Sequence, residues 1–176
     1  MLYPDREARI LAFLDALSIP YTLMHHGAVY TMDDCRDVPC KPDTAYCKNL
    51  FLANRQQTAL YLLCLRGDQP FRSGDVSRQL GVSRLSFAPE ALLPDCLGLL
   101  PGAVSALGLF FDGARRVQLV LDNAFLRCAH VAFHPCVNTA TVVMPTQDFI
   151  NTFLPAVSHV PRWVQIGPKD EECALI

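Results

Sequence analysis

Residues 47–53, with the sequence Cys-Lys-Asn-Leu-Phe-Leu-Ala, form the first of two apolar, β-prone runs, and the second covers residues 58–65. The polar residues 54–57 between them predict a β-hairpin. Lys48 is unusual here, because a lysine at the start of a half-buried strand loses hydration and needs a partner or a cleft mouth for its ammonium group. Two interpretations stay open: a strand-end lysine whose ammonium snorkels to solvent, or a fixed cation for an anionic or carbonyl-bearing substrate.

Outside this hairpin, short strands alternate irregularly with helices. Helices are expected over residues 5–17, 73–80 and 123–128, with a helix start at Thr31 and a last helix from Thr146. Strands are expected over residues 21–25, 82–87, 131–133 and 139–144, and over a second hairpin, 107–111 with 117–122, around the turn pair Asp112-Gly113. The pattern lacks the regular alternation of a doubly wound sheet, so the predicted class is α/β of the α+β kind, with six or seven strands mostly in antiparallel hairpins.

Length and composition indicate one globular domain. The chain has 176 residues, of which 51% are hydrophobic and 18% are charged. Residues 1–155 are expected to form the domain, and the proline-containing segment 156–176 to form a tail that is loosely docked or disordered. No apolar run approaches the roughly 20 residues of a membrane span, so no membrane partner is expected. The formal charge of −2 argues against a wide electrostatic footprint on nucleic acid, although a grip on a few phosphates remains compatible with it.

The eight cysteines favour a reducing compartment, because the N-terminus lacks the features of a secretory signal and the chain is too large to need disulfide stapling. We therefore expect free thiols and a cytoplasmic location.

Cys128, His130, His134 and Cys136 would share one face of an extended strand and raise the possibility of zinc. Four such residues span roughly 25 Å at about 3.3 Å per residue, too far for one tetrahedral ion unless Pro135 folds the strand back. The alternative is a core strand with buried cysteines, and we expect no metal. A rigidly held His134 can orient a water or a hydroxyl, or it is simply a structural histidine.

Five segments together resemble the YbaK/ProX family of aminoacyl-tRNA deacylases, relatives of the editing domain inserted in bacterial prolyl-tRNA synthetase. These segments are residues 26–31, 48–52, 80–87, 101–105 and 133–141, in the order that the family shows. The resemblance covers about residues 5–155 and is greatest to the free-standing ProXp-ala/PrdX branch.

The resemblance implies a mixed β-sheet curled toward a barrel with flanking helices, and hydrolysis of mischarged aminoacyl-tRNA, typically alanine attached to tRNA(Pro). It implies no cofactor. The implied partners are the tRNA acceptor end and, as a second candidate, prolyl-tRNA synthetase. The implied catalytic residues are Lys48, Asn49 and His134. The implied substrate-binding residues are Val29, Thr31, Gly102, Ala103, Val104, Ser105, Asn138 and Thr139. By analogy, the free 2′-hydroxyl of the terminal adenosine would assist the attacking water.

One departure concerns the loop after Gly102, where many relatives have a proline and this chain has Ser105-Ala106-Leu107. Loss of a proline loosens a loop, so the amino acid that the enzyme removes from the tRNA is left open. The alternatives are therefore the same reaction on mischarged serine or cysteine, a non-catalytic module that binds tRNA or a synthetase, and a zinc module built on the Cys/His run.

Overall fold

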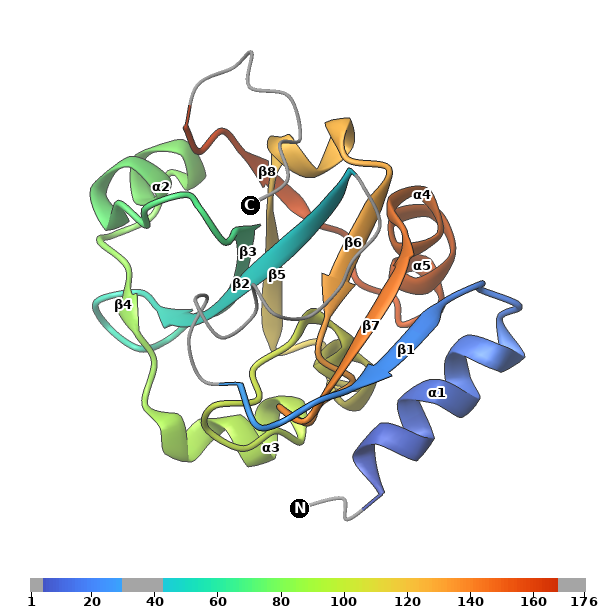
Figure 1. Ribbon diagram of the computed structural model, residues 1–176. Helices are drawn as coiled ribbons and strands as arrows, with labels where there is room; N and C mark the ends of the chain where they lie inside the picture. The colour runs from blue at the N-terminus through green and yellow to red at the C-terminus, as the bar shows by residue number, and fades with distance from the viewer. Residues whose placement is uncertain (1–4, 30–42, 168–176) are drawn as a thin grey trace.

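The computed structural model describes residues 5–29 and 43–167, and an eight-stranded sheet lies at its centre (Figure 1). The strands are β1 (Thr22–His25), β2 (Thr44–Ala53), β3 (Leu60–Arg66), β4 (Ser86–Phe87), β5 (Val117–Asp122), β6 (His130–Phe133), β7 (Ala140–Pro145) and β8 (Arg162–Val164). The α-helices are α1 (Arg6–Ala16), α2 (Ser73–Leu80), α3 (Leu93–Leu97), α4 (Thr146–Asp148) and α5 (Leu154–Ala156). Short helical turns of other types are η2 (Glu90–Leu92), η3 (Ala106–Phe111), η4 (Asn123–Arg127) and η5 (Phe149–Phe153). The helix start predicted at Thr31 lies outside the described residues.

The strand order is β1-β7-β6-β2-β3-β5-β8, and β4 pairs with β2 off this path. Four strand pairs are antiparallel and three are parallel. The outermost strands, β1 and β8, do not pair with each other, so the sheet remains open. The predicted class is confirmed: a mixed, mostly antiparallel sheet with helices around it.

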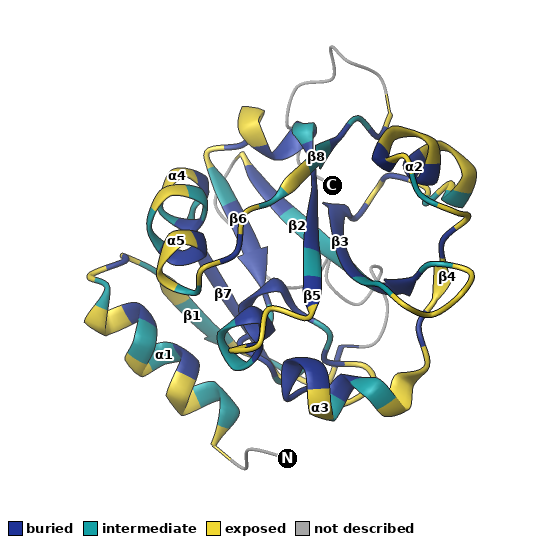
Figure 2. Ribbon diagram, turned by 180° about the vertical axis from the view of Figure 1, so that it is seen from behind, coloured by how far each residue is buried: buried dark blue, intermediate teal, exposed yellow. Residues whose placement is uncertain are grey.

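Two hydrophobic cores lie on opposite faces of the central strands, because successive side chains of a strand alternate. On β2, Phe51 belongs to the larger core and Leu52 to the smaller one. Helices α1, α3 and α5 pack residues into the larger core, and α2 packs Val76 and Leu80 into the smaller core. Figure 2 shows the central strands β3 and β5 almost entirely in the dark blue of buried residues, as expected for strands covered on both faces. Within the described ranges, no helix has both the length and the apolar character that a membrane span requires.

The hairpin predicted around residues 54–57 is confirmed as β2 and β3, whereas the hairpin predicted around Asp112-Gly113 is wrong. Residues 106–111 form η3, whose first turn is capped by the Ser105 hydroxyl accepting the N–H of Leu107. Strand β5 then pairs in parallel with β3 and β8 instead of folding back on its own neighbour. The apolar residues 107–111 resemble a strand in composition, but the capping serine and the carboxylate after them favour a helical turn and a redirected chain.

The segment after residue 155 also differs from the expected loose tail as far as residue 167. Strand β8 extends the sheet beside β5, and Val164 and Ile166 are buried in the smaller core. The Arg162 guanidinium donates to the carbonyl of Leu80 at the end of α2, at 2.8 Å. The burial of Val164 and Ile166 and the pairing of β8 with β5 order this segment in spite of its prolines. The rest of the tail, 168–176, lies outside the described residues.

Four cysteines of the described part are free thiols: Cys47, Cys64, Cys96 and Cys136. Burial raises the pKa of each of these thiols, which keeps them protonated at neutral pH. Cys128 takes part in a disulfide, so the expectation of free thiols throughout is wrong at this position.

A buried pair, Asp112 and His159, ties the C-terminal segment to the turn before β5. The Asp112 carboxylate accepts from the Arg116 N–H at 3.0 Å, the Val117 N–H at 2.8 Å and the His159 Nε2 at 3.3 Å. Burial alone raises the pKa of Asp112, but the hydrogen bonds from His159, Arg116 and Val117 outweigh it, and the pKa lies below its ordinary value. The folded state therefore stabilises the ionised carboxylate.

Asp112→Asn should lower the free energy of unfolding by about 1–3 kcal/mol, because it weakens a buried carboxylate with three donors. A lowered folded pKa means that this contribution is present above the unfolded pKa of Asp and is lost as pH falls through the folded pKa. Urea unfolding of both proteins from pH 5.5 to 2.5 should show the difference shrinking toward acid. Glu90→Gln, an exposed acid, is the matched control, and a pH-independent difference would contradict the assignment.

Candidate active site at the open edge of strand β2

Strand β2 carries Lys48 and Asn49, and its edge opposite β3 is only partly paired. Strand β6 pairs with residues 44–46 of β2, and β4 pairs with residues 52–53, which leaves a gap between them along the same edge. The Phe51 carbonyl accepts the N–H of Ala88 on this side. Because backbone groups of alternate residues point to the same edge, the N–H and C=O of Asn49 point into the gap. The gap is therefore a place where a ligand can meet free backbone groups.

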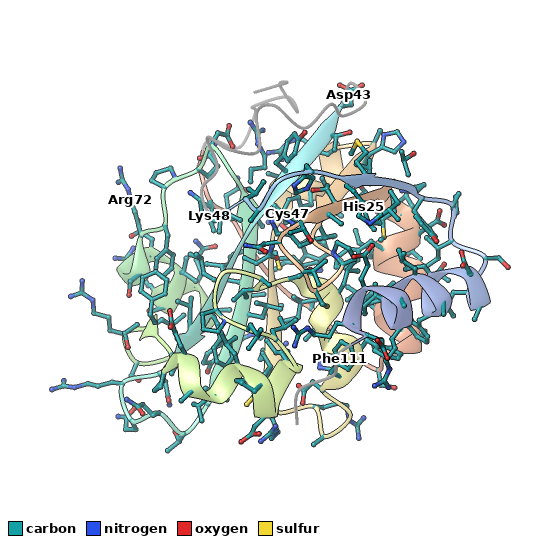
Figure 3. The ribbon with its side chains drawn as sticks, turned by 60° about the horizontal axis from the view of Figure 1, so that its bottom comes forward. His25, Asp43, Cys47, Lys48, Arg72 and Phe111 are labelled. Atoms are coloured by element: carbon teal, nitrogen blue, oxygen red, sulfur yellow. The ribbon has the colours of Figure 1, made fainter. Side chains whose placement is uncertain are left out.

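Lys48 lies on the face of the smaller core, level with Leu65 of β3. Its Nζ donates to the backbone carbonyl of Gln69 at 3.1 Å, which fixes the end of the side chain. Within the described residues, no carboxylate forms an ion pair with Lys48. A neutral carbonyl leaves the positive charge uncompensated and two ammonium donors unused, so Lys48 is a fixed cation available to an anion or a carbonyl oxygen. Figure 3 shows Lys48 between Cys47 and Arg72.

Asn49 points to the opposite face from Lys48, toward the larger core. Its Nδ2 donates to the carbonyl of Cys47 at 3.1 Å, and its Oδ1 accepts from the Cys64 thiol at 3.1 Å. Burial raises the pKa of Cys64, so this thiol keeps the proton that it donates. The amide is held on both sides. The structure thus separates the side chains of the two predicted catalytic neighbours, and what Asn49 presents at the open edge is its backbone.

His134 lies at the end of β6, next to the same gap. The parallel register with β2 ends at the pair Tyr46 and Ala132, and His134 follows the last residue of β6, Phe133, so it lies at the end of β6 that borders the gap. Its Nδ1 donates to the carbonyl of Ala140 at 2.9 Å, because a carbonyl can only accept. Burial lowers the pKa of His134; the bond to Ala140 acts in the opposite direction, and the charge of His26 lowers it further. The neutral ring keeps an Nε2 lone pair as an acceptor.

His26 and Thr141 adjoin His134 and were not among the predicted site residues. The His26 ring centroid lies 6.2 Å from that of His134, and its Nε2 is hydrogen-bonded to the Thr141 hydroxyl at 2.9 Å. The other ring nitrogen, Nδ1, donates to the carbonyl of Gly27 at 2.7 Å. His26 lies in the motif 26–31 and Thr141 in the motif 133–141. These motifs indicated the family, but nothing in the sequence indicated that the two segments contact each other.

The predicted substrate-binding residues fall into two groups. Val29, Asn138 and Thr139 lie together, since the Val29 N–H donates to the Asn138 carbonyl and the His26 N–H to the Thr139 carbonyl, both at 2.9 Å. Asn138 and Thr139 therefore hold the segment 26–29 beside His134 through their backbone. Thr31 lies outside the described residues.

The loop 101–105 forms the second group. Gly102 has a φ of +82°, a backbone conformation that glycine adopts without strain, and it is exposed. Ala103 is buried and its N–H donates to the Leu100 carbonyl, while Val104 packs against the larger core. Ser105 is fully buried and caps η3, so its hydroxyl has a structural role. Among the described residues, no hydrogen bond joins this loop to Lys48, Asn49 or His134.

The zinc alternative receives no support from the described part of the chain, where no three His, Cys, Asp or Glu side chains cluster as metal ligands would. His134 and Cys136 follow the end of β6, where Cys136 has a φ of +64° and is fully buried.

A family model described as "Aminoacyl-tRNA editing domain" matches residues 26–152. The chain belongs to the aminoacyl-tRNA editing domain family. This confirms the predicted family and the predicted enzyme class, an aminoacyl-tRNA deacylase. The matched residues contain β2, the gap beside it and His134.

Relatives of this editing domain support the assignment. "Prolyl-tRNA editing protein ProX" of Acetoanaerobium sticklandii is 35% identical over 144 residues, which cover 82% of this chain and 88% of the relative. "Prolyl-tRNA synthetase associated domain-containing protein 1" of Danio rerio is 33% identical over 159 residues, covering 89% of this chain and 85% of the relative. The crystal structure of a candidate trans-editing enzyme for prolyl tRNA synthetase has the same fold, with a TM-score of 0.68 at 15% identity, covering 96% of this chain and 99% of that one.

The His134 ring should titrate with a pKa below the ordinary value of about 6.5. NMR of the ring protons as a function of pH measures this pKa. Burial is the main cause, so His26→Asn should raise this pKa only modestly, by removing the neighbouring charge. His25→Asn is the matched control, because His25 is exposed and bonds Glu7 at 2.6 Å. A His134 that titrates at or above pH 6.5 would rule out a neutral acceptor ring.

Proposed function

We propose that this protein acts in trans on mischarged aminoacyl-tRNA and that its substrate is Ala-tRNA(Pro). The observation that carries the proposal is the uncompensated ammonium of Lys48, held by the Gln69 carbonyl beside an unpaired strand edge. A cation and free backbone donors suit an ester that carries a carbonyl and an adjacent phosphate. The name of the bacterial relative, a prolyl-tRNA editing protein, supports the prolyl system.

The chemistry needs no covalent intermediate, since an aminoacyl ester is already activated. A water attacks the carbonyl carbon, and the oxyanion that forms needs positive charge or N–H donors close to it. Lys48 holds the terminal phosphate or the carbonyl oxygen, and the Asn49 N–H at the open edge is a second donor. The free 2′-hydroxyl assists the water, whose proton reaches the leaving ribose oxygen as the C–O bond breaks. The products are the free amino acid and the intact tRNA.

His134 serves this scheme as a neutral acceptor. With its Nδ1 proton committed to the Ala140 carbonyl, Nε2 can accept from a ribose hydroxyl or from the attacking water. The bond between the His26 ring and the Thr141 hydroxyl keeps a second ring beside it. The site thus positions the substrate's own hydroxyl instead of supplying a strong base.

Selection of the amino acid is proposed to depend on size. A pocket that fits an alanine side chain excludes the larger proline ring sterically, whereas rewarding one extra methylene is worth only about 1–3 kcal/mol. Val29, which is buried beside the Asn138 backbone, and the loop with Gly102 and Ala103 are the proposed walls. The missing proline in that loop keeps serine and cysteine as the alternative side chains. The proposed partners are the tRNA(Pro) acceptor end and, secondarily, prolyl-tRNA synthetase, and the proposed location is the cytoplasm.

A deacylation panel tests the substrate directly. Purified protein should release amino acid from Ala-tRNA(Pro) faster than from Ser-tRNA(Pro) or Cys-tRNA(Pro), and it should spare Pro-tRNA(Pro), because the pocket admits small side chains only. Release of labelled amino acid at equal tRNA concentrations measures this order. Faster clearance of the serine or cysteine ester would replace alanine as the substrate, and binding without any hydrolysis would indicate the non-catalytic module.

Lys48→Met should reduce kcat/KM on the preferred ester by about 10²–10³-fold, the usual effect of removing one charge-stabilising donor. Methionine keeps the apolar stem on the smaller core, so a loss reports the charge. Arg55→Met, at an exposed position in the β2–β3 turn, is the matched control for loss of a cation. Unchanged rates in Lys48→Met would remove Lys48 from the mechanism.

A further inference from the structure

An exposed aromatic pair lies on the same face of the sheet as Lys48. Phe87 on β4 is 67% exposed, the second most exposed of the large hydrophobic side chains in the described residues. Its ring contacts that of Phe71, with centroids 6.2 Å apart in an edge-to-face arrangement. Phe71 itself is partly buried against the smaller core. The pair is therefore a rigid aromatic surface, with Phe71 as the anchored ring and Phe87 as the open one.

The strand register connects this pair to Lys48. Lys48, Leu50 and Leu52 are alternate residues of β2 and share one face. Phe87 pairs with Leu52 across the β2–β4 ladder and lies on that same face. The separation along β2 from Lys48 to Leu52 is about 13 Å, at about 3.3 Å per residue.

A second connection runs through the loop before α2. The Gln69 carbonyl accepts from Lys48, and Phe71 follows Gln69 by two residues. Lys48 and the aromatic pair are thus joined both by a strand and by a short loop.

Two arginines lie close to the pair in the sequence. Arg72 follows Phe71 directly, and Arg84 precedes Phe87 by three residues; both are exposed, and within the described residues neither forms an ion pair. Figure 3 shows Arg72 pointing away from the body of the molecule. Next to Arg72 is a groove of about 500 Å³, whose lining includes Gln69, Arg78 and one carboxylate, Asp75. Asp75 is already paired with Arg78 at 3.3 Å. Aromatic faces with uncompensated arginines beside them are the combination that single-stranded nucleic acid uses.

We propose that Phe87, supported by Phe71, is a stacking platform for a nucleobase of the single-stranded tRNA acceptor end, with Arg72 and Arg84 as its phosphate contacts. This rests on the proposed function, which places the ester of the terminal adenosine beside Lys48. The distance along β2 then assigns the platform to a base preceding that adenosine, one of the two cytosines of the terminal CCA. Stacking explains how a chain with a formal charge of −2 can hold RNA, because it needs no broad positive surface.

Binding of a fluorescent, unacylated single-stranded RNA ending in CCA tests the platform without any chemistry. Phe87→Ala should weaken binding about 5- to 100-fold, and Phe87→Trp should retain it, since tryptophan offers a larger stacking face. Leu126→Ala, which removes another exposed apolar side chain (52% exposed) on η4, is the matched control and should bind as the wild type does. Thermal melting confirms that each variant is folded, and Phe87→Leu keeps an apolar contact with Phe71 if the alanine variant melts early.

The same RNA with abasic residues in place of the two cytosines separates stacking from a general loss of binding. The wild type should bind the abasic RNA as weakly as Phe87→Ala binds the normal RNA. The affinity of Phe87→Ala should be the same for both RNAs, because the variant has no stacking contact left to lose. Wild-type affinity of Phe87→Ala for the CCA RNA overturns the platform. If Phe87→Ala still binds the RNA but binds prolyl-tRNA synthetase more weakly, the platform is also overturned. The aromatic pair would then be a contact with the synthetase.

Hydrolysis is measured separately, so that the two proposals fail separately. In Phe87→Ala, kcat/KM should fall more for aminoacyl-tRNA than for an aminoacyl ester of adenosine alone, which lacks the stacked base. Phe87-dependent RNA binding by a protein that hydrolyses no aminoacyl ester would sink the proposed function and leave the platform standing.

Discussion

The hydrogen bond from Lys48 to the Gln69 carbonyl is the interaction on which the rest of the site depends. A lysine in a half-buried strand is unfavourable unless its charge finds a partner. A carboxylate partner would have neutralised the charge, whereas a backbone carbonyl holds the ammonium in place and leaves its charge available. The position of Gln69 is in turn fixed by the end of β3 and the loop into α2. The smaller core, α2 and β8 thus all contribute to holding one cation.

The incomplete pairing of β2 is the second constraint. A strand of ten residues that met β6 along its full length would have no free backbone groups at Asn49. The chain instead ends β6 at Phe133 and brings in β4 only at Leu52, so the sheet opens where the cation lies. Asn49 is only partly buried, so water can bond its backbone groups at the open edge until a ligand replaces that water. The fold and the proposed chemistry are consistent at this point.

Much of this arrangement follows from the sequence, and some of it does not. The β2–β3 hairpin and α2 with Gly81 after it have strong local signals, namely alternating apolar runs, a polar turn and a left-handed C-terminal glycine. The parallel pairing of β2 with β6 and of β5 with β8 has none, because such ladders join residues far apart in the chain. Lys48 and Asn49 were predicted together as catalytic residues because they are adjacent in the sequence. In β2, however, adjacent side chains alternate, so the two side chains point to opposite faces. His26 was missed as a site residue because its partner, Thr141, is 115 residues away.

The second hairpin shows how local signals can compete. Asp112-Gly113 is a strong turn pair between two apolar runs, yet the Asp112 carboxylate accepts from the N–H groups of Arg116 and Val117 and from His159. Those bonds join the turn before β5 to His159, in the segment that leads into β8. The bond to His159 is one of several that hold this segment, together with the β5–β8 ladder and the bond from Arg162 to Leu80. Ile166, which lines the groove next to Gln69, is held by a different carboxylate, because its N–H donates to Asp122 Oδ1 at 3.2 Å. Two buried aspartates thus hold the C-terminal segment, one before β8 and one after it.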